Sequence, residues 1–420
     1  MKPSSLMSQA AISTGGVLAQ GLARFAYTVL IGRVMGPEDL AHVSAWIALA
    51  LILSLLWPTG AGNAAAHFLA HERALGHSPV PALRLIQRSF WISCAGMLLI
   101  GFPVAMIALG ADIGDTIAIG VLIVTWSGYV LARGIEVGLG RITSAAVWDV
   151  ISSATTIGLL TIVLVTSLPG ALLWPIAIGY AVFALHSLRG AHLGHDELRQ
   201  ESGLEPARIL KFISWNSLGL LASNGLIQFA MVFVFIVEPP LTAGLFAAAM
   251  SLATPASMLS QAITQVLIPR FTEWVAADRV ASRRRYLIVF GVMFLGLGAV
   301  FGAVALASPI VVDVVFHATY REAAPIMAFL LIGVFAFSIS LVATAYLLTT
   351  GRTRVATAAS VVGLVVGLIV MVAGTPVLTG SWAAVAGVIS GYTVTAVWVI
   401  AASFGRVQAD APRGIHVPLV

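Results

Sequence analysis

One arginine lies inside the first long apolar stretch of the chain. Residues 7–31 are long enough to cross a bilayer as a helix, and Arg24 lies well within them. An arginine at bilayer depth costs roughly 2.5 kcal/mol or more, so it usually faces a bundle interior or a wet cavity. Its planar fork of donors suits phosphate or pyrophosphate. We predict that Arg24 binds such a group. The alternative is a guanidinium that bonds helix carbonyls or extends to the membrane surface.

Amide side chains recur at helical spacing in two later apolar stretches. Asn224 and Gln228 are four residues apart, and Gln261 and Gln265 repeat that spacing. Each pair therefore shares one helix face. Amides can bond sugar hydroxyls in a substrate site, and they can equally bond each other between helices. As a set on adjacent helices they favour a polar cavity lining, and we include all four in the predicted substrate site.

Asn63 also belongs to the predicted substrate site. It follows Pro58, Gly60 and Gly62 at the expected end of the second apolar stretch. These residues can let a helix bend, or they can end it. We interpret them as a helix end.

Apart from Asp115 at the edge of the expected span 114–133, Asp149 is the one acidic residue that we place inside an expected membrane span. A proton- or sodium-coupled transporter needs such a carboxylate, so Asp149 is a candidate for ion coupling. A carboxylate near the membrane surface, or one paired with Arg141, is the more common arrangement.

The elements that must position these side chains are transmembrane helices. The 420 residues are 59% hydrophobic and 9% charged, whereas soluble proteins carry about 25% charged residues. The fold class that we predict is an all-α polytopic membrane protein with about twelve transmembrane helices in two six-helix bundles around a central cavity. The expected spans are residues 7–32, 41–62, 86–110, 114–133, 142–167, 170–189, 210–236, 241–269, 286–310, 323–350, 353–376 and 380–404.

The basic residues set the expected orientation. With the N-terminus inside, these spans place nearly all of the 22 Lys and Arg residues in cytoplasmic segments, Arg133 and Arg141 among them. We therefore expect a multi-pass protein of the inner (cytoplasmic) membrane with both termini cytoplasmic. The polar segment near the middle divides the chain into an N-terminal bundle (1–195), a cytoplasmic linker (196–209) and a C-terminal bundle (210–420).

Three pairs of glycines stand four residues apart in apolar stretches. They are Gly298 with Gly302, Gly363 with Gly367, and Gly387 with Gly391. This spacing is typical of close contacts between membrane helices. It predicts packing and indicates nothing about a substrate.

Two segments carry a resemblance to a known family. Residues 24–27 (RFAY) and 31–40 (IGRVMGPEDL), followed by an aliphatic helix, resemble polysaccharide-biosynthesis flippases of the multidrug/oligosaccharidyl-lipid/polysaccharide exporter (MOP) superfamily. Residues 242–248 (TAGLFAA) add a weaker match in the second half. The chain has Leu40-Ala41 where the family usually has Tyr-Gly. The resemblance implies alternating access by two bundles, and a polyprenyl-linked sugar with an anionic phosphate as cargo. It also implies contact with membrane lipids and, among proteins, with polysaccharide polymerase and glycosyltransferases.

Two other functions stay open at this stage. An ion-coupled multidrug exporter of related fold would use Asp149. A membrane polysaccharide polymerase or ligase would need a sizeable outer loop, and the longest expected one is residues 311–322. No P-loop, catalytic triad or metal-ligand spacing is present in the sequence. The single cysteine, Cys94, excludes a disulfide framework. We therefore expect no enzymatic activity, no cofactor, no metal and no nucleic-acid partner.

Overall fold

The computed structural model describes residues 3–190 and 205–405, and every regular element in these ranges is helical. Short π-helical and 3₁₀ turns lie at Val104–Ala108, Pro169–Ala171 and Ala318–Tyr320. The α-helices are α1 (Pro3–Val34), α2 (Pro37–Leu56), α3 (Pro58–Ala74), α4 (Val80–Pro103), α5 (Ile113–Gly138), α6 (Ile142–Val165), α7 (Trp174–Gly190), α8 (Pro206–Val237), α9 (Pro240–Ala277), α10 (Arg279–Leu306), α11 (Ser308–Phe316), α12 (Ala323–Thr349), α13 (Thr353–Gly374) and α14 (Gly380–Phe404).

The helices match the predicted spans in order. Within the described residues, ten helical segments are long and apolar enough to cross a membrane. Helices α1 and α9, of 32 and 38 residues, are long enough to cross a membrane but are not among these ten. A twenty-residue helix already spans the hydrocarbon core of a bilayer. The predicted all-α, multi-pass membrane fold is confirmed.

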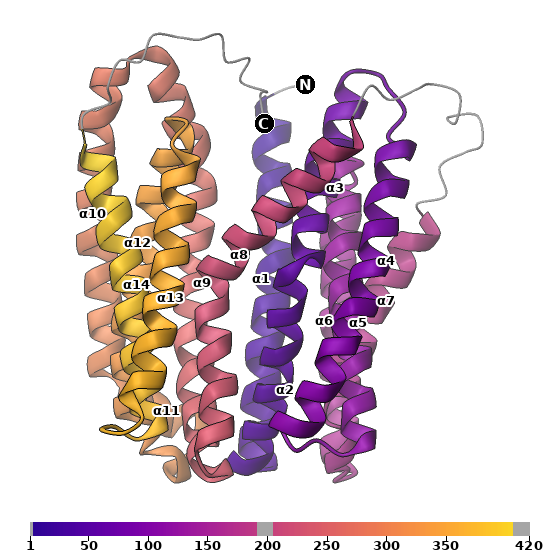
Figure 1. Ribbon diagram of the computed structural model, residues 1–420, viewed down its shortest axis with the longest axis vertical. Coiled ribbons are helices and arrows are strands. Elements are labelled where there is room, and N and C mark those ends of the chain that lie inside the picture. Colours follow the sequence, from indigo (N-terminus) through magenta and orange to yellow (C-terminus); the bar gives the residue numbers. More distant parts are fainter. Residues whose placement is uncertain (1–2, 191–204, 406–420) are drawn as a thin grey trace.

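Two bundles stand side by side (Figure 1). Helices α1–α7 form one bundle and α9–α14 form the other. Helix α8 begins against α3 and crosses to pack on α13 and α14, so it joins the two bundles. Most of the predicted linker, 196–209, falls outside the described residues, and α8 already begins at Pro206.

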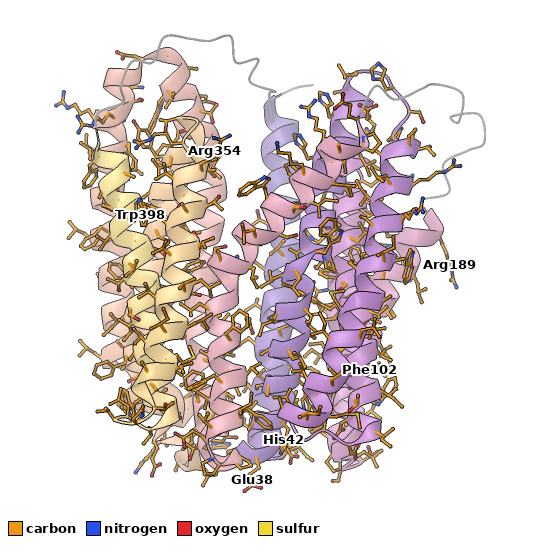
Figure 2. The ribbon with its side chains drawn as sticks, in the orientation of Figure 1. Glu38, His42, Phe102, Arg189, Arg354 and Trp398 are labelled. Carbon is orange, nitrogen blue, oxygen red and sulfur yellow. The ribbon has the colours of Figure 1, made fainter. Side chains whose placement is uncertain are left out.

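The two ends of the molecule differ in charge. We call the end where α1 begins and α14 ends the basic end. Figure 2 labels Arg354 near this end, whereas Glu38 and His42 lie at the other, which we call the opposite end. If Lys and Arg gather in the cytoplasm, the basic end is the cytoplasmic one.

The second predicted span bends where we expected it to end. Pro58 has no N–H group, so the carbonyl of Ser54 loses its helical donor. The Thr59 hydroxyl donates to that carbonyl instead, at 3.0 Å, and the chain continues as α3 to Ala74. The interpretation of this segment as a helix end is therefore wrong.

Two glycines of α3 permit close packing beyond the bend. A Cβ atom on Gly60 would lie 2.8 Å from the carbonyl oxygen of Ile213 in α8. One on Gly62 would lie 2.7 Å from that of Val130 in α5. Side chains at these positions would therefore push the helices apart. The glycines hold α3 against both of its neighbours.

The glycine pairs of α13 and α14 confirm the predicted close contact. A Cβ on Gly363 would lie 2.5 Å from the carbonyl oxygen of Gly391, and one on Gly367 would lie 2.8 Å from that of Gly387. The prediction is wrong for the third pair. Gly302 faces open space, and Gly298 has only ordinary contact with Phe335.

We expect Gly391→Ala to destabilise the protein, because its methyl group would meet the Gly363 carbonyl oxygen at 2.6 Å and a Leu226 methyl group at the same distance. Overpacking of this kind costs about 1–3 kcal/mol. Gly302→Ala is the matched control, since nothing lies within 4 Å of its Cβ. Thermal unfolding in detergent measures both variants. Equal melting temperatures for the two would contradict the α13–α14 contact.

Candidate functional site

A cavity of about 360 Å³ lies between the two bundles. Helices α1, α2, α3 and α5 line it from one bundle, α12 and α14 line it from the other, and α8 and α9 complete it. Ligand cavities typically measure roughly 300–1,000 Å³ and combine an apolar lining with a few polar groups. The polar lining residues are Thr14, Gln20, Arg24, Thr59, Tyr129, Asn224, Gln228, Thr254 and Tyr392.

Arg24 lines this cavity, as its position inside the first span predicted. Its guanidinium carbon lies 5.2 Å from the centroid of the Trp126 ring, a cation–π arrangement. Among the described residues, Arg24 forms no ion pair with a carboxylate. A half-buried guanidinium without a counter-charge can accept an anionic ligand.

Asn224 and Gln228 lie on the same cavity wall as their spacing predicted. The Asn224 amide donates to the Ser223 hydroxyl at 2.9 Å. Gln228 borders the main cavity and also a smaller one of about 80 Å³. The structure therefore brings two of the four predicted amides to Arg24. The side chains of the other two, Gln261 and Gln265, fall outside the described residues.

A smaller cavity continues from Arg24 toward the opposite end. It shares Arg24 and Gln228 with the main cavity and adds the hydroxyl groups of Thr28, Ser44 and Ser251. Thr28 is one helical turn beyond Arg24 along α1. Polar groups therefore continue past Arg24 into the part of the molecule where the bundles meet.

Asn63 does not line either cavity. Its amide donates to the side-chain oxygen of Asn216 at 2.8 Å and so joins α3 to α8. This is the contact between helices that we weighed for the other amides. Asn63 holds two elements together near the basic end.

Asp149 is fully buried inside the N-terminal bundle. Its carboxylate accepts from Arg133 Nε at 3.1 Å and from the Tyr129 hydroxyl at 2.8 Å, while the Gln20 amide donates to its backbone carbonyl at 3.1 Å. Arg133 also donates to the hydroxyl of Ser13 at 3.3 Å. The network therefore joins α1, α5 and α6.

The predicted pairing of Asp149 with Arg141 is wrong. Arg141 lies 3.9 Å from the carboxylate of Glu136. Glu136 is itself buried in α5, which runs five residues past the predicted end of its span. Asp149 is therefore not the only acidic residue within a span. Arg133, which we assigned to a cytoplasmic segment, is the actual partner.

Sequence reasoning missed the contribution of α5 to the site. Trp126 and Tyr129 line the cavity, and Arg133 follows them. The three residues occupy positions i, i+3 and i+7, which lie on one helix face. That spacing was visible in the sequence and marks the polar face of α5.

Comparisons with known proteins give the fold an independent reference. No family model and no curated protein matches the chain. Solved structures do match. A multidrug resistance MATE family transporter of the MOP superfamily, in an inward-facing conformation, superposes with a TM-score of 0.75 at 17% identity, over 91% of this chain and 93% of that one. This chain therefore shares the fold of that transporter, with two helical bundles of the MATE-like type.

Other solved structures support the same fold. The lipid II flippase MurJ, in an inward closed conformation, matches with a TM-score of 0.67 at 12% identity, over 92% of this chain and 86% of MurJ. A MOP superfamily transporter from Pyrococcus furiosus, described as having a binding pocket of reverse polarity, matches with a TM-score of 0.65 at 17% identity, over 94% and 93% of the two chains. Exporters and a flippase therefore share the architecture.

In this fold the two bundles meet at the opposite end. The Arg33 side chain of α1 donates to the carbonyl oxygens of Val314 and Val315 in α11. The Tyr320 hydroxyl donates to the carbonyl of Gly32 at 2.8 Å. Away from this end, α3 contacts α8 through the Asn63–Asn216 hydrogen bond and through the packing of Phe68 on Phe212. The cavity is therefore closed toward the opposite end.

We expect the double variant Arg33→Ala, Tyr320→Phe to open this closed end, because it removes the hydrogen bonds of both side chains to the partner bundle. Thr28→Cys, in a Cys94→Ala background, should then react roughly tenfold faster with a membrane-impermeant maleimide added on the side of the membrane that the opposite end faces. Thr14→Cys, on the cavity wall toward the basic end, is the comparison and should become less reactive with the same reagent added on the other side. Unchanged rates at both positions would contradict this closure.

Proposed function

We propose that this chain is a transporter that flips a polyprenyl-phosphate-linked oligosaccharide across the cytoplasmic membrane by alternating access, for cell-surface polysaccharide synthesis. The observation that carries the proposal is Arg24. It is a membrane-embedded cation with no carboxylate partner among the described residues, in a cavity between two bundles and beside the amides Asn224 and Gln228.

Charge explains why a flippase would need this residue. A phosphate group that enters a low-dielectric passage loses its hydration, at a cost of several kcal/mol. A fixed guanidinium with a fork of N–H donors offsets that cost and recognises the phosphate geometry. The neighbouring amides and hydroxyls supply uncharged hydrogen-bonding groups for sugar. The lining of the cavity extends along α1 from Arg24 to Thr14, toward the end that we propose to be cytoplasmic and where such lipids would enter.

The proposed partners follow from this cargo. The transporter would receive its substrate from glycosyltransferases, deliver it to a polysaccharide polymerase, and contact membrane lipids throughout. The proposal assigns no catalytic role to any residue. The cavity needs only to bind the substrate, and the bundles need only to open it to one side of the membrane and then to the other.

An ion-coupled multidrug exporter is the second candidate. Its support is the likeness to MATE transporters and the buried carboxylate of Asp149. Two observations weigh against it. Asp149 is already paired with Arg133, and no described residue lining the main cavity carries a carboxylate. A cationic drug would therefore meet Arg24 without an opposing charge.

A transport assay in proteoliposomes tests the two candidates directly. The purified protein is given a fluorescent polyprenyl-pyrophosphate oligosaccharide in one leaflet, and its appearance in the other leaflet is followed. Protein-dependent transfer is expected. If the protein moves no lipid but extrudes cationic dyes along a proton or sodium gradient, the exporter replaces the flippase.

A further inference from the structure

A separate cavity of about 160 Å³ lies within the C-terminal half, between α8, α12, α13 and α14. None of its described lining residues is charged. Hydroxyl groups dominate its polar lining instead, and they come from all four helices. Among these residues are Ser223, Ser340, Thr344, Thr357, Ser360 and Thr395.

Most of these hydroxyl groups already donate a hydrogen bond. Ser340 donates to the carbonyl of Phe337 at 2.7 Å, Ser360 to that of Ala356 at 3.1 Å, and Thr395 to that of Gly391 at 3.1 Å. Each hydroxyl oxygen keeps lone pairs that can still accept. Among the described residues, the Thr344 hydroxyl makes no hydrogen bond. The cavity therefore offers acceptors, and it suits a neutral ligand rich in O–H donors.

Two aromatic residues stand between this cavity and the main one. Phe337 and Tyr392 line both, and their ring centroids are 4.9 Å apart at an interplanar angle of 38°. A ligand that occupies both cavities needs these side chains to rotate aside so that the cavities join. Arg24 stands on the far side of the main cavity, in the N-terminal bundle. The joined space is therefore cationic at one end and neutral and rich in hydroxyl groups at the other.

We propose that the C-terminal cavity binds one uncharged sugar unit of the transported glycan while Arg24 holds the phosphate. This inference rests on the proposed function and adds an orientation of the substrate to it. A buried water needs at least roughly 10–15 Å³ of such space, so the cavity of about 160 Å³ has room for several waters, which suits a single sugar ring with its hydroxyl groups. A bound sugar would replace those waters and keep their hydrogen bonds. Phe337 and Tyr392 would present apolar ring faces to the C–H groups of the sugar.

The test compares two lipids on the same protein in lipid nanodiscs. One is fluorescent polyprenyl pyrophosphate, and the other is the same lipid with a neutral trisaccharide attached. The variant combines Thr344→Val and Ser360→Ala, which remove two hydroxyl groups and change little volume. We expect its affinity for the glycan-bearing lipid to fall roughly tenfold, while its affinity for the sugar-free lipid stays unchanged.

A matched control carries the same two substitutions outside the cavity. Thr161→Val on α6 and Ser390→Ala on α14 remove hydroxyl groups that bond their own helices, as Ser360 does. The control should bind both lipids as the wild type does.

The outcomes separate this inference from the proposed function. If the wild-type protein binds both lipids equally, or if the variant loses both equally, the sugar site is overturned while phosphate binding stands. If added sodium alone displaces the glycan-bearing lipid, the cavity is a cation site and the sugar assignment fails. If the wild type binds neither lipid, the proposed function itself fails.

Discussion

Replacing Arg24 with alanine is expected to slow transport of a polyprenyl-pyrophosphate glycan by at least about a hundredfold. The substitution removes the one charged side chain among the described residues that line the main cavity, and with it the proposed bidentate contact to phosphate. A hydrogen bond to a charged group contributes about 1.5–3 kcal/mol, and two such bonds set this magnitude. The proteoliposome assay measures the transfer rate.

Two further variants show whether a loss of transport in Arg24→Ala comes from the lost charge at this position or from a general effect of removing an arginine. Arg24→Lys keeps the charge but loses the planar fork, so we expect intermediate transport. Arg354→Ala removes an exposed arginine at the basic end and should transport at the wild-type rate. Wild-type transport by a well-folded Arg24→Ala protein would remove the cation from the mechanism.

The sequence located the polar core of the site because the bilayer makes polar residues rare and therefore informative. Arg24 is costly at its depth unless it faces a cavity, and the structure places it in one. Asn224 and Gln228 were placed together by helical spacing, which needs no tertiary information. The two-bundle fold followed from apolar stretches of membrane length, with the basic residues as a check on their number.

Contacts between distant helices were not predictable in the same way. Asn63 has the polar amide side chain expected of a site residue, yet it bonds to Asn216, which stands 153 positions later. Nothing local reveals that α8 crosses from one bundle to the other. The glycine pairs were mispredicted for the same reason, because the local sequence does not show which pair another helix packs against. The spacing of Gly298 and Gly302 equals that of Gly363 and Gly367, but only the second pair meets another helix closely.

Helix ends account for the remaining errors. The predicted fourth span stopped at the charged residue Arg133, whereas α5 runs to Gly138. Gly134 and Gly138 explain the extension, since added Cβ atoms there would lie 2.0 Å from the carbonyl oxygen of Gly62 and 2.6 Å from that of Ala65. Packing against α3 therefore continues the helix past the apolar stretch. Once Arg133 is inside the bundle, it reaches Asp149.

Replacing Asp149 with alanine is expected to destabilise the protein by about 3–5 kcal/mol. Its carboxylate is fully buried and accepts hydrogen bonds from Arg133 and Tyr129. Without it, the Arg133 guanidinium, with a side chain only 21% exposed, loses its counter-charge, and the buried Tyr129 hydroxyl loses its acceptor. Breaking one partner of a buried ion pair costs this much because the other charge stays uncompensated. Thermal and denaturant unfolding in detergent measure the loss.

The control for this prediction removes both charges together. Asp149→Leu with Arg133→Met replaces the ion pair by apolar side chains, which is often neutral or stabilising. The double variant should therefore be more stable than Asp149→Ala, and equal instability would show that the pair is not the cause. Asp149→Asn keeps an acceptor for Tyr129 and should unfold between wild type and alanine. Because the carboxylate is held by Arg133 within the bundle, we expect Asp149→Asn to transport. An asparagine variant that folds normally but loses ion-dependent transport would instead assign coupling to Asp149.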